Sequence, residues 1–173
     1  MKCRAAAACY LLMLEISMTM LLAGCHTYMG TIEVGRPAVG GIGKNATEPL
    51  SSVELNTIKE IAEHVAVSYK MKSIPIGGAI GSLNIESRSS YVLLNAYERY
   101  ENPFLGDQIN IKMFVEVSKD RSVVRIIIRN YIDWMENNLT SSMKEMLLKE
   151  LKGSGRQYRL VYRKERVEAV FFH

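Results

Sequence analysis

The chain has 173 residues, with 22 Lys and Arg against 18 Asp and Glu, which gives a net charge of +4. This length suits one domain with a sizeable hydrophobic core. So mild a positive charge gives no support for nucleic-acid binding, which usually accompanies a denser basic patch.

The N-terminal segment has the parts of a secretory signal peptide. Two basic residues, Lys2 and Arg4, precede a mostly apolar run from Ala5 to Ala23 that ends in small residues. The run is also about as long as a membrane-spanning helix. Its end, Leu22-Ala23-Gly24-Cys25, resembles the lipobox of bacterial lipoproteins. The resemblance implies that the Cys25 thiol receives a diacylglyceryl group, that the chain is cut before it, and that the new amine is acylated.

The same resemblance implies a place in the bacterial cell envelope, anchored to the membrane through acyl chains. The outer membrane is favoured in a Gram-negative cell, because His26 and not an aspartate follows the cysteine. Glu15 departs from the pattern, since a carboxylate in an apolar run costs about 2.5–3.5 kcal/mol on insertion scales. The working apolar core is then residues 16–23, or translation begins later, for instance at Met13. The alternative is a retained apolar helix with an incidental cysteine.

Processing before Cys25 would leave 149 residues with 20 basic and 17 acidic side chains, a net charge of +3. Cys3 and Cys9 would leave with residues 1–24, so no free thiol would remain for a CxxC redox site or a cysteine nucleophile. The three histidines are far apart in sequence, and no HExxH or Cys/His cluster occurs. We therefore expect no metal and no cofactor.

Residues 25–50 are rich in glycine and also contain Pro37 and Pro49. Such breakers with little apolar periodicity predict a flexible linker that holds the domain off the membrane. The glycines before Lys44 do not form a phosphate loop, since GxxxxGK[ST] would need glycine at Ala38 and a hydroxyl at Asn45.

A helix is expected to follow, with Ser51 and Glu54 as a capping box, and to run to about Met71. Its apolar stripe has helical spacing, and His64 lies on the flank as a solvated side chain or, alternatively, a ligand. The stripe of this helix consists of Leu55, Ile58, Ile61, Ala62, Val65 and Tyr69.

We expect residues 74–82 to form a tight turn on the core or, alternatively, a lipid- or partner-facing loop.

Residues 91–100 suit a helix or a strand, and a strand is favoured. Alternating apolar residues over 109–118 and 124–129 predict a strong antiparallel hairpin that turns at 119–122. A second helix should start at Thr140 or Ser141 and end at Gly153 or Gly155. A last strand covers 158–162, and residues 167–171 extend it or return beside it.

This order predicts an α+β fold: an antiparallel sheet of about four strands with two helices packed on one face. We expect a single domain over residues 51–173, preceded by the signal peptide (1–24) and the linker (25–50).

The sheet face opposite the helices is the candidate binding surface. Guanidinium groups near aromatic rings hold anionic groups, although the same side chains also pair across strands on a solvated face. Trp134 is a possible partner anchor or packs under the second helix. The candidate residues are Lys112, Arg125, Arg129, Arg159, Arg163 and Trp134, with Glu116 and Tyr131 close by.

No GxSxG motif occurs, and neither His64 nor His173 suits a catalytic triad, so we expect no catalysis. The favoured hypothesis is a non-catalytic binding or assembly module for a protein partner in the envelope. The alternative is a module for anionic envelope material, meaning lipid headgroups or peptidoglycan, bound through the arginine-lined sheet face. An unrecognised hydrolase is a third alternative.

Overall fold

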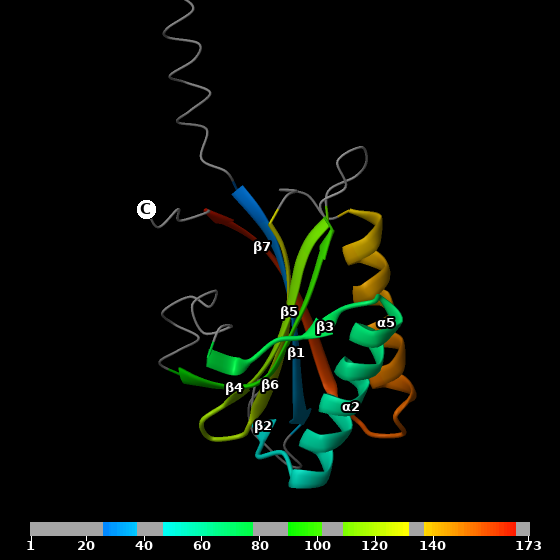
Figure 1. Ribbon diagram of the computed structural model, residues 1–173. Coiled ribbons are helices and arrows are strands. Elements are labelled where there is room, and N and C mark those ends of the chain that lie inside the picture. Colours follow the sequence, from blue (N-terminus) through cyan, green and yellow to red (C-terminus); the bar gives the residue numbers. More distant parts are fainter. Residues whose placement is uncertain (1–25, 38–46, 78–89, 102–108, 132–136, 169–173) are drawn as a thin grey trace, which may run out of the picture.

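The computed structural model describes residues 26–37, 47–77, 90–101, 109–131 and 137–168 (Figure 1). Candidate lipidation site Cys25, Trp134 and the proposed signal peptide lie outside these ranges. The elements in chain order are β1 (His26–Pro37), β2 (Thr47–Glu48), α2 (Ser52–Ser68), β3 (Lys72–Ser73), β4 (Tyr91–Glu101), β5 (Ile109–Ser118), β6 (Val123–Asn130), α5 (Asn138–Gly153) and β7 (Arg159–Glu168).

The strands form one sheet in which every pairing is antiparallel. β1 lies inside it, between β6 and β7, and the order continues from β6 through β5 and β4 to the short β3. Both helices pack on the same side of the sheet (Figure 1). The predicted α+β class is therefore confirmed, but the sheet has seven strands, two of them only two residues long, and not about four.

The prediction of a linker is wrong for residues 26–37, which form the 12-residue strand β1. Ile32 and Val34 are fully buried in the main core, so the domain begins well before residue 51. The glycine that looked like a breaker has a packing role: a Cβ on Gly30 would lie 2.5 Å from the Tyr28 hydroxyl. Pro37 is the last residue of β1, a position at which proline is tolerated in a strand.

Both helices start with a capping box. Ser51 and Glu54 cap α2 as predicted, and the helix ends at Ser68, before Lys70 takes a φ of 57°. The predicted start of the second helix is wrong by about three residues. Asn137 is its N-cap: the Asn137 side chain accepts from the Thr140 backbone N–H, and the Thr140 hydroxyl accepts from the Asn137 backbone N–H.

The core is made of two clusters on opposite faces of the sheet. The main one joins the α2 and α5 stripes to the predicted inward residues of β5 and β6. The strand favoured for residues 91–100 is confirmed as β4, and β7 continues as one strand to Glu168. Residues 169–171 of the predicted extension lie outside the described ranges. The second cluster consists of Met29, Ala96, Phe114 and Ile127, with Ile74 and Leu93 packed against it. Phe114 of β5 is therefore a core residue on the face opposite the helices.

Candidate functional site

The five basic residues predicted from alternation do lie on one sheet face, opposite α2 and α5; we call it the far face. Strand register places Lys112 beside Arg129, and Arg125 beside Glu116. The β7 residues on this face are Arg159 and Arg163, opposite Gly35 and Thr31 of β1. The arginines do not converge on one point, because they fall into three groups.

The first group is centred on Arg125, which register places between Glu33 of β1 and Glu116 of β5. Arg125 is 8 % exposed and Glu116 is 1 % exposed. The guanidinium carbon lies 4.5 Å from the centre of the Tyr91 ring. A buried cation between two carboxylates is a structural element of the sheet, so Arg125 is not at an accessible binding surface.

The second group surrounds Tyr131, just beyond the end of β6. The Lys112 ammonium lies 5.5 Å from the ring centre, and the Arg129 guanidinium lies 4.7 Å from it. All three residues are half-buried. The ring thus accepts two cation–π contacts, and these contacts fix both side chains near one end of the sheet.

The third group lies on β7, where an Arg163 amino group is 3.3 Å from a Glu33 carboxylate oxygen. Arg159 is at the opposite end of the face from Tyr131. On the far face, the register rows of Lys112, Arg125 and Arg129 also hold four carboxylates, those of Glu33, Glu98, Glu116 and Glu165. These carboxylates offset much of the positive charge of this face.

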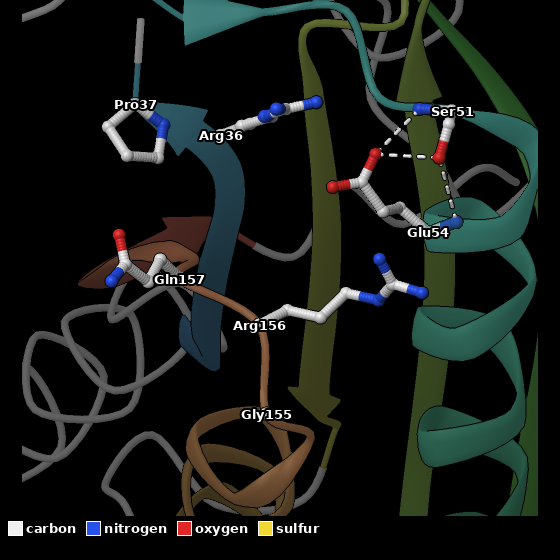
Figure 2. Close-up of a pocket in the computed structure, with 7 residues that line it drawn as sticks. All are labelled: Arg36, Pro37, Ser51, Glu54, Gly155, Arg156 and Gln157. Atoms are coloured by element: carbon white, nitrogen blue, oxygen red, sulfur yellow. Dashed lines mark hydrogen bonds between the residues drawn. The ribbon is translucent and has the colours of Figure 1, made fainter. Parts of the chain in front are cut away.

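A pocket that sequence reasoning missed lies at the end of β1 where β2 pairs with it (Figure 2). Its volume is about 370 Å³. Seven residues from three regions of the chain line it: Arg36, Pro37, Ser51, Glu54, Gly155, Arg156 and Gln157. The only local signal for it was the Ser51–Glu54 capping box, since Arg36 fell in the predicted linker.

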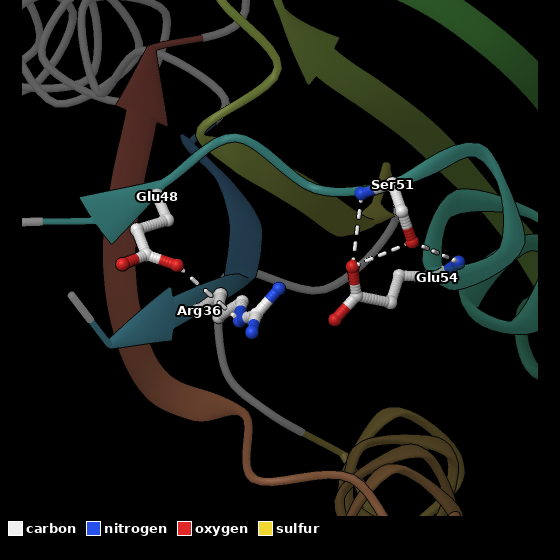
Figure 3. Close-up of polar contacts among 4 residues, drawn as sticks. All are labelled: Arg36, Glu48, Ser51 and Glu54. Atoms are coloured by element: carbon white, nitrogen blue, oxygen red, sulfur yellow. Dashed lines mark hydrogen bonds and ion pairs between the residues drawn. The ribbon is translucent and has the colours of Figure 1, made fainter. Parts of the chain in front are cut away.

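The carboxylate of Glu54 is held in place by Ser51 (Figure 3). Its Oε2 accepts from the Ser51 backbone N–H at 2.9 Å and from the Ser51 hydroxyl at 2.7 Å. These hydrogen bonds, aided by the positive charges of Arg36 and Arg156, lower the pKa of Glu54 below its ordinary value. The carboxylate therefore stays ionised although Glu54 is only 7 % exposed.

Two arginines point toward this carboxylate from different sides (Figure 2). Arg36 comes from β1, and its Nε lies 3.5 Å from Glu48 of β2. Arg156 comes from the α5–β7 turn, where Gly155 adopts a φ of 73° that favours glycine. Since the turn and the strand are more than a hundred residues apart, only the fold brings these side chains together.

Of the two histidines considered for catalysis, His173 lies outside the described residues. His64 is mostly exposed, and its Nδ1 lies 2.9 Å from Glu150 of α5, so its role is a surface contact between helices. Within the described ranges, no group of three or more His, Cys, Asp and Glu side chains is placed to hold a metal ion. Among the described residues, no helix is long and apolar enough to cross a membrane.

Comparison with known proteins gives no relative. No family model, no curated protein and no solved structure matches this chain.

Proposed function

We propose that this chain is a lipid-anchored, non-catalytic module of the bacterial cell envelope that binds a protein partner. Its anchor is Cys25, acylated after cleavage of residues 1–24. The observation that carries the binding role is the outermost long strand, β7, which within the described residues pairs only with β1.

The proposed anchor, Cys25, directly precedes β1, and β1 pairs with β7, the strand proposed to bind the partner. β1 begins at His26, directly after Cys25, and His26 lies opposite Glu168 near the end of β7. A lipidated Cys25 would therefore place this end of the sheet at the membrane surface with no spacer. The other end of β1, twelve residues on, would lie about 40 Å away at roughly 3.3 Å per residue.

The free edge of β7 suits an extended acidic segment of a partner. A strand at a sheet edge presents unpaired backbone N–H and C=O groups, and an added strand satisfies them. β7 spans ten residues and carries four basic and two acidic side chains. Arg163 and Lys164 are exposed, so they favour a strand with carboxylates at matching positions.

The alternative, anionic envelope material on the far face, has less support. Four carboxylates on this face weaken its attraction for a polyanion, and Arg125 is buried among carboxylates of its own sheet. A protein partner, recognised by strand addition, does not need a strongly basic face.

Site-specific photo-crosslinking in intact cells tests this proposal. A photoreactive residue at Lys164 should give a discrete protein adduct, because this exposed position lies on the strand that would pair with the partner. The matched control is the exposed Val67 of α2, on the helix layer. Charge reversal by Arg163→Glu, in a chain that keeps the photoreactive residue at position 164, should abolish the adduct. Equal adducts from both positions, an adduct only with a second copy of this chain, or no adduct at all would contradict the proposed docking edge.

A further inference from the structure

The pocket of Figure 2 combines charges of both signs in a way that restricts its ligand. Two guanidinium groups and one ionised carboxylate face a space of about 370 Å³. This volume is at the small end of ligand-binding cavities. We propose that the pocket binds a small α-amino carboxylate, such as a free amino acid, with its carboxylate on Arg36 and Arg156 and its ammonium on Glu54.

The two arginines have donors available for a carboxylate. Arg36 uses Nε toward Glu48, and no hydrogen bond from its two terminal amino groups occurs within the described residues. Arg156 has no ion pair within 4 Å in the described part of the chain, and it is exposed at the pocket. Guanidinium groups bind carboxylates through paired N–H donors, so two of them on different walls fix both position and orientation.

The ionised carboxylate of Glu54 disfavours a ligand that carries only negative charge. Its Oε2 is taken by the two Ser51 donors, while its Oε1 has no hydrogen-bond partner within the described residues and points toward the pocket in Figure 2. A ligand with only negative charge would meet this fixed carboxylate at close range. A ligand that also carries an ammonium group complements all three side chains, since the ammonium is attracted to Glu54.

The location suits a binding site that is independent of the anchor. Arg36 lies near the end of β1 that is farthest from residue 25, and β2 and the start of α2 border the pocket. The inference stands on the pocket alone and does not require lipidation or the β7 docking edge.

Binding measurements on the full chain, purified in detergent micelles, test this inference. Saturation-transfer NMR with L-alanine should show saturable binding, with acetate and ethylammonium each at least tenfold weaker. Inorganic phosphate should not compete with alanine at equal concentration. These four probes separate a zwitterion site from an anion site and from a cation site.

Four variants, one of them a control, assign the roles. Arg156→Gln should weaken alanine binding at least tenfold. Glu54→Gln removes the negative charge, while glutamine can still complete the capping box with Ser51. This variant should weaken the binding of alanine but not the binding of acetate. Lys72→Gln removes an exposed charge on β3, away from the pocket, and should change nothing. Circular dichroism of each variant checks that it is folded, and Arg156→Lys provides a second, milder change at the same position.

Three results would overturn the proposal: no saturable alanine binding by the wild type at millimolar concentration, alanine binding unchanged in Arg156→Gln, or tighter binding of phosphate than of alanine. The last result would make the pocket a simple anion site.

Discussion

The position of β1 inside the sheet is tested by shortening one of its buried side chains. Ile32 is 0 % exposed and lies in the main core. Ile32→Ala removes three carbon atoms from a close-packed site, and such changes cost about 2–5 kcal/mol. Since the free energy of unfolding of a domain is about 5–15 kcal/mol, the loss would be a large part of the total. Ile32→Val should cost less, about 0.5–1.5 kcal/mol.

Urea unfolding followed by circular dichroism measures this cost as a lower midpoint at unchanged slope. The control is Val53→Ala on α2, where an apolar side chain of similar size is 62 % exposed. It should change the unfolding free energy by less than about 0.5 kcal/mol. If Ile32→Ala were as harmless as this control, residues 26–37 would be the tether that their glycine content suggests, and the sheet order would be wrong.

Three other predictions concern single side chains. Gly30→Ala should lower the thermal midpoint, with a cost of about 1–3 kcal/mol, because the new Cβ would lie 2.5 Å from the Tyr28 hydroxyl; an unchanged midpoint would contradict this packing. Arg125→Ala should cost about 3–5 kcal/mol in urea unfolding, since it leaves Glu116 buried without the neighbouring cation, and a neutral result would mean that Arg125 is solvated. The pKa of Glu54 is lower in the folded state than in the unfolded chain, so its stabilising effect is fully present above the ordinary pKa of an unfolded glutamate and is lost as pH falls through the folded pKa. Glu54→Gln should therefore reduce the acid-induced loss of stability below that pH, and identical pH profiles of the two proteins would contradict this.

The parts of the fold with local signals could be predicted from the sequence. The alternation of Ile111, Met113 and Val115 with polar residues predicts the hairpin of β5 and β6, because the residues of these strands that face the helices are apolar. The start of α2 was predicted because the Ser51–Glu54 capping box spans only four residues. In both cases the residues that determine the structure are neighbours in the chain.

The parts that depend on distant contacts could not be predicted in this way. Gly30 appears as a breaker until the Tyr28 and Tyr162 hydroxyls are seen beside it, and Tyr162 follows 132 positions later. Without β1, Glu33 was missing from the far face, so Arg125 seemed free to bind a ligand. The pocket of Arg36 and Arg156 joins the two ends of the described chain, and no sequence spacing indicates such a meeting.

The anchor at Cys25 is the central claim, and labelled palmitate tests it most directly. We would measure incorporation of the label and membrane fractionation for the wild type and for Cys25→Ala. The proposal predicts label in the wild type, none in the variant, and a wild-type band shortened by the 24 residues of the signal peptide. Unlabelled wild type that remains full-length in the membrane fraction would contradict lipidation and would show that the apolar N-terminal run is retained.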